Sequence, residues 1–287
     1  MFPKVWRSIV TRWDHYLFGV GYGLVFGFFG ITALVVDTPQ ADVPNGLGEV
    51  STASAPTSRH WFGTNRDGMD LLGPTLAAAG RSAWLTLVAV VLGSSSGLAV
   101  AASAFLIGSD RGYRALAAFQ SGIGLVPALL MMFILAAGFG AGVGATILML
   151  GALCLGFVAG RGANWCVAWE DGGDVISARA LGFSRRRILQ ELLFPRLWPK
   201  AAATAATLLP AALVAEAALG FSGAGASVAA ANGRIGVMLG VGRETMFDLP
   251  WMIISSGAVL WVLTMVLAGL AWAVRRTLDE PVDERWF

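Results

Sequence analysis

Six runs of apolar residues, each about as long as a membrane-spanning helix, constrain the fold of this chain more than any other feature. The runs cover residues 17–36, 82–107, 116–138, 143–160, 201–221 and 250–274. A helix needs about 20 apolar residues to cross the hydrocarbon core of a bilayer. Because backbone polar groups cannot be left unpaired in lipid, helices are the natural solution. The sequence therefore predicts an all-α integral membrane protein with six transmembrane helices.

Composition supports a bilayer rather than water as the main solvent. Of the 287 residues, 56% are hydrophobic and only 13% are charged, whereas roughly a quarter are charged in a typical soluble protein. The mean hydropathy is +0.69. The first run is longer than the apolar part of a secretory signal, so we interpret it as an uncleaved anchor.

The lysines and arginines are distributed unequally between the two sides of the six predicted spans. With both termini in the cytoplasm, fifteen of the twenty lie on the cytoplasmic side and five on the outer side. Cytoplasmic loops of membrane proteins carry such an excess of positive charge. The sequence thus predicts cytoplasmic N and C termini, and a cytoplasmic location for the charged stretch 174–200.

This topology divides the chain into three parts. Residues 1–81 form an N-terminal cytoplasmic segment, the first transmembrane helix and an outer loop, in which 37–80 is expected to be mostly loop because it contains four prolines. Residues 82–275 form a core of five transmembrane helices with a cytoplasmic loop at 161–200. Residues 276–287 form a cytoplasmic tail.

The stretch 174–200 reads as two short helices joined by a turn. Asp174 and Ser184 are residue types that cap helix N-termini, and Gly182 supplies a position that can adopt positive φ between them. Pro195 is expected to limit the second helix. The apolar face of that helix is expected to comprise Ile188, Leu189, Leu192 and Leu193.

The same stretch resembles the EAA loop of bacterial ABC importer permeases, whose consensus is EAA, three residues, Gly, nine residues, then I-x-L-P. Ala178, Gly182 and Pro195 match the consensus with its spacing, and Leu192 stands at the isoleucine. Ile176 replaces the glutamate, which is a departure from the consensus. The run ARALG at 178–182 resembles the dipeptide, oligopeptide and nickel permease branch.

Two further segments resemble the same branch. Residues 213–225, LVAEAALGFSGAG, are similar to its LAEAALSFLGLG segment, and residues 60–72, HWFGTNRDGMDLL, are similar to its FGTDxLGRDVL stretch. In the latter, Asn65 and Met69 replace an aspartate and an arginine. The three pieces keep their order and spacing from about residue 60 to the C-terminal end.

The resemblance implies a permease subunit of an ATP-driven importer in the bacterial inner membrane, with di- or oligopeptides as its expected cargo. Its implied partners are a homologous second permease forming a heterodimer, two ABC ATPase subunits that hold ATP-Mg, and an outer substrate-binding protein. No cofactor, metal or catalytic residue is implied in this chain, and no nucleic acid. The residues implied to couple to the ATPases are Val175, Ile176, Ala178, Arg179, Leu181, Gly182, Arg185, Arg186, Arg187 and Pro195.

A few residues could carry chemistry by themselves. Glu216 is the acidic residue well inside a predicted span, so it should face the bundle or a wet cavity, either as a gate or as a buried carboxylate that holds the helices in register. The charges of the outer segment 222–249 are expected to form a solvated face, and 235–241 a short helix against the membrane surface. Those charged and polar residues are Asn232, Arg234, Arg243, Glu244 and Asp248. No phosphate-binding GxxxxGK[ST] loop occurs, so ATP must be held elsewhere.

Three other functions stay open at this stage. The same architecture could import nickel or another chelated metal. An ion-coupled secondary transporter is another class, but the spans hold almost no charges besides Glu216. An intramembrane serine protease would use Ser222 in GFSGA, close to GxSxG, but the two histidines, His15 and His60, lie before the first span and in the outer loop.

Small residues are frequent in the predicted spans, as at 93–97 and 138–144. They allow helices to approach closely, or they make helices that bend during transport. Both interpretations stand, and Pro127 and Pro210 are expected to kink their spans.

Overall fold

A computed structural model of the chain describes residues 53–108, 128–139, 142–170, 172–223 and 233–279, together with the single residues 27, 115 and 118. Within these ranges all secondary-structure elements are helices, apart from one isolated β-bridge between Thr64 and Asp70. The helices are α2 (Leu72–Ile107), α4 (Ala128–Phe139), α5 (Val143–Glu170), α6 (Gly173–Ala180), α7 (Arg185–Ile188), the π-helix η1 (Leu189–Leu193), α8 (Phe194–Phe221), α9 (Ile235–Glu244) and α10 (Pro250–Asp279).

Four helical runs of the described ranges are long and apolar enough to cross a membrane: Leu72–Ile107, Val143–Glu170, Arg185–Phe221 and Pro250–Leu278. They confirm an α-helical protein of the multi-pass membrane class and correspond to four of the six predicted spans. The predicted span 17–36 lies outside the described residues except for Gly27. The span 116–138 is described mainly by α4, so the number six stays a prediction.

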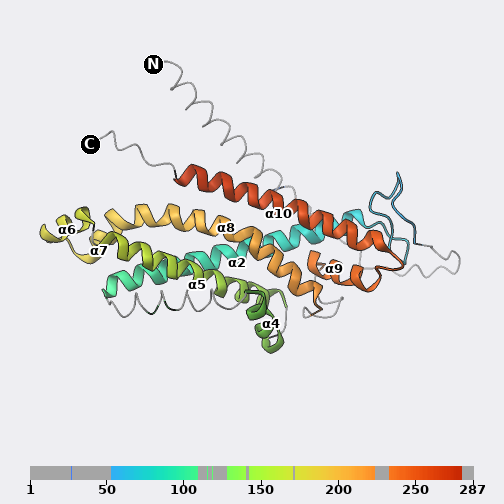
Figure 1. The fold of residues 1–287 in the computed structure, drawn as a ribbon, viewed down its shortest axis with the longest axis horizontal. Helices are drawn as coiled ribbons and strands as arrows, with labels where there is room; N and C mark the ends of the chain where they lie inside the picture. Colours follow the sequence, from blue (N-terminus) through green and yellow to red (C-terminus); the bar gives the residue numbers. More distant parts are fainter. Residues whose placement is uncertain are drawn as a thin grey trace, which may run out of the picture.

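The four long helices run side by side along the length of the molecule (Figure 1), and α8 packs against α2, α5 and α10. The short helices α6 and α7 lie at one end of this bundle and α9 lies near the other end. The bundle therefore has two distinct ends, separated by about the length of its long helices.

Helix α2 begins ten residues earlier than the predicted span. Its first turn contains Pro74, whose missing N–H is not needed there because the first N–H groups of a helix have no intrahelical acceptor. Thr75 and the alanines 77–79 are buried against the rest of the bundle. Tertiary burial thus extends the helix into a stretch predicted to be loop.

Glycines bring α2 and α5 into close contact. A Cβ atom on Gly93 would lie 2.3 Å from the carbonyl oxygen of Gly151, and one on Gly97 would lie 2.6 Å from that of Leu155. By contrast, a Cβ on Gly138, Gly142 or Gly144 would meet nothing within 4 Å. At 93–97 the small residues therefore serve helix packing, whereas at 138–144 such packing does not explain them.

The chain passes through Pro195 without a break, which corrects the expectation that this proline limits the second loop helix. α7, η1 and α8 form one helical run from Arg185 to Phe221. In η1 the N–H of Phe194 reaches the carbonyl of Leu189, five residues back. This wider turn fits the proline ring, which would otherwise press on the carbonyl four residues before it. Pro210 also lies inside α8, while Pro127 is outside the described residues.

Candidate functional site

The turn between α6 and α7 has the geometry predicted from its glycine. Gly182 has φ +82° and a Cβ placed there would meet nothing within 4 Å, so backbone conformation alone favours glycine. Its N–H donates to the carbonyl of Arg179 at 3.0 Å, and the N–H of Phe183 donates to that of Ala178 at 3.0 Å. These two bonds form a Schellman motif that ends α6.

The two predicted helix caps have different outcomes. Ser184 is the N-cap of α7, and its Oγ accepts a hydrogen bond from the N–H of Arg187 at 3.3 Å, which confirms that prediction. The N-cap of α6 is Gly172, so the prediction of an Asp174 cap was wrong. Asp174 lies in the first turn, where its carboxylate accepts from the N–H of Val175 and pairs with Arg196 at 2.5 Å.

That ion pair links the start of α6 to the start of α8. Partial burial by itself would raise the pKa of Asp174, but the hydrogen bond and the positive charge of Arg196, with the Val175 amide, outweigh it. The pKa of Asp174 therefore lies below its ordinary value. The carboxylate is thus kept charged near neutral pH and holds the α6–α7 loop (172–188) to α8.

A second set of contacts fastens the loop to the ends of α2 and α5. Arg185 Nη1 donates to the carbonyl oxygen of Phe105 at 3.0 Å, and Arg179 forms an ion pair with Glu170. Beneath them, Val175, Ala178 and Ile188 belong to a buried cluster with Phe105. The loop is therefore a packed extension of the bundle.

This packing divides the predicted coupling residues into two groups. Val175 and Ala178 are buried against α2 and α5 and present no surface to a partner. Ile176 and Leu181 are 54% and 77% exposed and form apolar tips of the loop, and Arg186 is exposed on α7. Pro195 is exposed on the first turn of α8.

At the opposite end of α8, Glu216 is fully buried and faces Arg234. The Oε1 atom of Glu216 lies 3.4 Å from Nη1 of Arg234, and Arg234 is only 2% exposed. The same Nη1 donates to Oγ1 of Thr146 on α5 at 3.1 Å. The next residue, Ile235, donates its N–H to Oγ of Ser82 on α2 at 3.1 Å. The pair thus joins the start of α9 to α2, α5 and α8.

The burial of Arg234 corrects the expectation of a wholly solvated outer face. Arg243, Glu244 and Asp248 are exposed as expected, and Asn232 lies outside the described residues. Arg234 was missed because the local sequence is polar and rich in glycine, which resembles a loop. The signal that could have found it is Glu216 itself, since an acid inside a helix bundle requires a partner.

Close backbone contact between α8 and α9 makes this pairing possible. A Cβ on Gly236 would lie 2.5 Å from the carbonyl oxygen of Ala217, and one on Gly220 would lie 2.7 Å from the backbone of Gly236. The predicted helix at 235–241 exists as α9, and its buried residues pack against α8 and α10. The two glycines therefore set the depth at which Arg234 meets Glu216.

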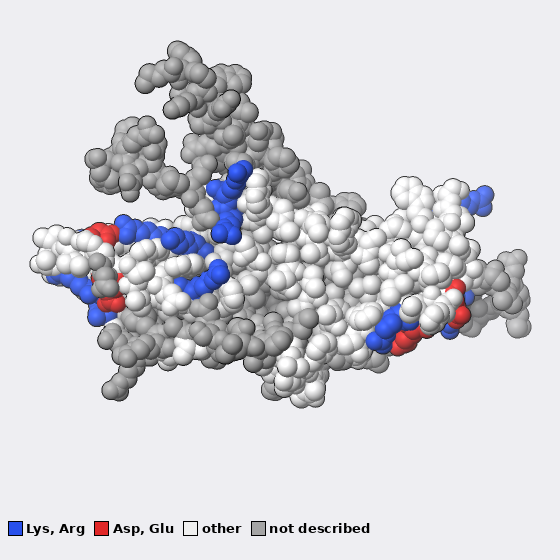
Figure 2. All heavy atoms as spheres, in the orientation of Figure 1, with Lys and Arg blue, Asp and Glu red and all other residues white. Residues whose placement is uncertain are grey.

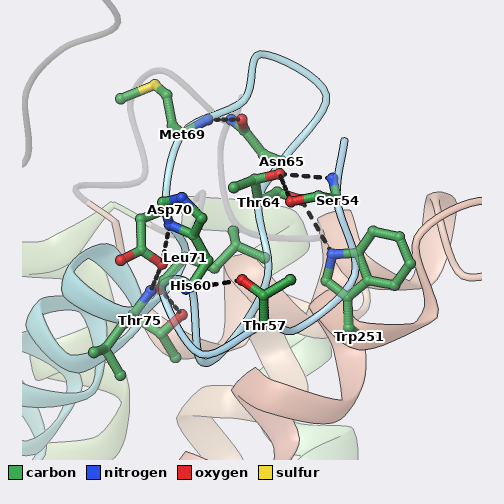
Figure 3. A network of polar contacts seen from close by, with 11 residues as sticks. Ser54, Thr57, His60, Thr64, Asn65, Met69, Asp70, Leu71, Thr75 and Trp251 are labelled. Carbon is green, nitrogen blue, oxygen red and sulfur yellow. Dashed lines mark hydrogen bonds and ion pairs between the residues drawn. The ribbon is translucent and has the colours of Figure 1, made fainter. Parts of the chain in front are cut away.

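The motif stretch 60–72 folds as an ordered loop over the start of α10 (Figure 3). Asn65 Oδ1 accepts the N–H groups of Asp67 and Met69, and Trp251 Nε1 donates to the carbonyl oxygen of Thr64 at 3.1 Å. Gly63, with φ +74°, lies so close to the Trp251 ring that a Cβ would be 2.6 Å from it. Asn65, which replaces an aspartate of the family stretch, thus still builds the turn.

Charged side chains gather at the two ends of the bundle and leave its middle largely uncharged on the face shown in Figure 2. Lysines and arginines dominate the end that carries α6 and α7. Large apolar side chains such as Trp261, Val262 and Met265 of α10 are exposed between the ends. This pattern suits a bundle whose middle lies in lipid.

Ser222, the residue considered as a nucleophile, follows the end of α8. Its hydroxyl donates to the carbonyl oxygen of Leu219 at 2.7 Å. His60 lies beside Asp70, with Nδ1 and Oδ1 3.8 Å apart. The serine hydroxyl is thus bonded within the C-terminal end of α8, and this geometry does not support the hypothesis of a serine protease.

The chain is similar to permease proteins over most of its length. It is 26% identical over 230 residues to the oligopeptide transport system permease protein OppC of Mycobacterium tuberculosis (strain H37Rv), which covers 79% of this chain and 78% of that protein. It is 24% identical over 236 residues to the D,D-dipeptide transport system permease protein DdpC of Escherichia coli K12, covering 82% and 78%.

A peptide permease protein of Brucella suis biovar 1 is 24% identical over 242 residues, covering 84% of this chain and 79% of that protein. No protein-family model matches the chain. Across about four fifths of its length, the chain is therefore a homologue of the permease proteins of peptide transport systems, as its three motif segments predicted.

Proposed function

We propose that the chain is the permease subunit of an ATP-driven ABC importer for di- or oligopeptides in the bacterial inner membrane. It would form the translocation pathway with a homologous second permease. Two separate ABC ATPase subunits would bind at the end that carries α6 and α7, and an outer binding protein would deliver the peptide. The homology to peptide permeases supports the solute class.

The observation that carries this proposal is the α6–α7 loop, which is anchored to the bundle and has exposed apolar tips. Its inner side is fixed by a buried cluster and by ion pairs, while Ile176 and Leu181 point outward. A short helix with apolar tips and neighbouring arginines has the properties of a segment that docks in a groove on a soluble partner. Because the loop is anchored to the bundle, a displacement of the loop would also displace the helices that it contacts.

The continuous helical run from Arg185 to Phe221 provides a mechanical route. It begins at the docking loop, crosses the bundle as α8 and contains Glu216 near its far end. Movement of the loop would therefore shift a membrane helix directly. Closure of the ATPases around ATP would in this way alternate the pathway between inward-open and outward-open states.

The test is copurification of the full chain with its genomically neighbouring permease and ATPases, followed by peptide-stimulated ATP hydrolysis with the binding protein in proteoliposomes. Leu181→Asp and Arg186→Glu should each lower recovery of the ATPases and stimulated hydrolysis by about tenfold, because they place negative charge on the docking tips. Phe247→Asp, at an exposed apolar residue of the opposite end, is the control for ATPase recovery, which it should leave unchanged.

The outcomes separate the competing functions. Stimulation by a nickel chelate in place of peptides would favour the metal importer. Uptake by the chain alone, driven by an ion gradient, would favour a secondary transporter. Full ATPase recovery with both loop variants would contradict docking at α6–α7. The permease function would then depend only on whether the unmodified chain copurifies with the ATPases.

A further inference from the structure

A basic cavity lies between three of the long helices, near the end of the bundle that carries α6 and α7. Its volume is about 230 Å³. Seven residues line it: Arg161 and Trp165 of α5, Lys200, Ala203, Thr204 and Thr207 of α8, and Arg275 of α10. The four α8 residues are spaced so that they share one face of that helix. The cavity is thus built by one face of α8 with a wall from α5 and another from α10.

The three cations that line the cavity occupy equivalent positions in their helices. Arg161 directly follows the apolar run 143–160, Lys200 directly precedes the run 201–221, and Arg275 directly follows the run 250–274. Each cation therefore stands where its helix leaves the apolar part of a membrane. Because all three line one cavity, the predicted spans would place that cavity at the depth of lipid headgroups.

Two of the three cations, Arg161 and Lys200, are not balanced by an acidic group of the described lining. None of the described lining residues is acidic, and the ion pairs found among described residues include neither Arg161 nor Lys200. Instead, Arg161 lies over the ring of Phe157 at 4.9 Å and Lys200 over that of Trp169 at 4.9 Å. Like charges held near each other in a partly enclosed space attract an anion.

From this arrangement we infer a binding site for the phosphodiester headgroup of an anionic phospholipid, such as phosphatidylglycerol. Arg161, Lys200 and Arg275 would donate to the phosphate oxygens, since guanidinium and ammonium groups pair well with phosphate. Basic pockets between transmembrane helices on the cytoplasmic side are of the kind that bind such headgroups. The inference depends on membrane insertion and not on which solute is transported.

A lipid fits this site better than a soluble anion because of what surrounds it. Trp165 lines the cavity, and Trp198 and Trp272 are exposed on the same helices near the three cations. Tryptophan is enriched at the membrane–water interface. The exposed apolar side chains of α10, including Met265, then continue toward the membrane centre and offer a surface for acyl chains. The headgroup would sit in the cavity while its chains stay in the bilayer.

The test measures lipid binding directly on the purified full chain. Native mass spectrometry from mild detergent would titrate phosphatidylglycerol and, separately, phosphatidylcholine of identical acyl chains. We expect one tightly held phosphatidylglycerol and clearly weaker phosphatidylcholine. The triple variant Arg161→Gln, Lys200→Gln, Arg275→Gln should weaken phosphatidylglycerol binding by about tenfold or more, because each basic residue contributes to the attraction.

The matched control is Arg179→Gln, Arg186→Gln, Arg187→Gln, which removes the same charge near the same end but does not alter the cavity lining. It should change binding less than about twofold. Equal loss in both triple variants, or equal affinity of the native chain for the two lipids, would overturn the site. Competition by millimolar inorganic phosphate would reveal a soluble-anion site and overturn the lipid assignment.

A charge-retaining variant guards against misfolding as the explanation. Arg161→Lys with Arg275→Lys keeps three cations at the cavity and should keep the preference for phosphatidylglycerol. Loss of the preference in this variant, with unchanged helical circular dichroism and elution, would contradict recognition by charge. Because lipid binding is read without ATP or peptide, failure here is distinguishable from failure of the importer proposal.

Discussion

At the scale of single residues, the buried pair of Glu216 and Arg234 constrains how the helices of the bundle pack. Both are buried and 3.4 Å apart. Removing one partner of such a pair leaves an uncompensated buried charge, which typically costs about 3–5 kcal/mol, whereas removing both costs much less. The pair therefore helps to set which helices meet.

A double-mutant cycle tests this pairing. Glu216→Gln and Arg234→Gln should each lower the free energy of unfolding by about 3 kcal/mol or more, and the double variant should cost less than the sum. The measurement is equilibrium unfolding in mixed detergent micelles. Arg243→Gln, at an exposed arginine of the same helix, is the control and should have little effect. Additive losses would mean that the two side chains do not interact.

Gly182 can be tested against a matched glycine at the other end of α6. Gly182→Pro demands a negative φ where the chain has +82°, so it should break the turn. Gly173→Pro places proline at the first helical position after an extended Gly172, where it is tolerated. Hydrogen exchange of the 175–188 amides should accelerate at least about tenfold in the first variant. Similar exchange in both variants would show that the loop does not depend on this turn.

At the scale of helices, the contact between α2 and α5 depends on its glycines. Gly93→Ala would put a Cβ 2.3 Å from the carbonyl oxygen of Gly151, so the helices must separate. We expect a loss of about 1–3 kcal/mol. Gly144→Ala, where the added methyl meets nothing within 4 Å, should be neutral or stabilising because alanine favours helix over glycine. Thermal unfolding in detergent compares the two, and equal stability would contradict close packing at Gly93.

At the scale of the whole molecule, the distribution of charge predicts which end faces the cytoplasm. A cysteine at Ser184 should react with a membrane-impermeant maleimide only after cells are opened, and a cysteine at Ser58 should react in intact cells. The unmodified chain is the control, because Cys154 and Cys166 are both buried. Labelling of Ser184→Cys from outside intact cells would contradict the predicted topology. The α6–α7 end proposed to bind the ATPases would then lie outside the cell, and the end proposed to receive the binding protein would lie inside.

Local sequence was sufficient for the features that depend on neighbouring residues. Apolar runs predicted the four helices of the described ranges that are long and apolar enough to cross a membrane. The glycine between two short helices predicted the left-handed turn at Gly182, and the serine after it predicted the cap of α7. These predictions succeed because solvent, hydrogen bonding within one turn and the absence of a Cβ act over a few residues.

Tertiary structure alone decided the features that depend on residues far apart in the chain. It placed Arg234 opposite Glu216 and turned Val175 and Ala178 inward. It also chose which glycines are contact points and brought three flanking cations to one cavity. The physical reason is that burial and pairing are set by the neighbour across the interface, and sequence spacing does not specify that neighbour.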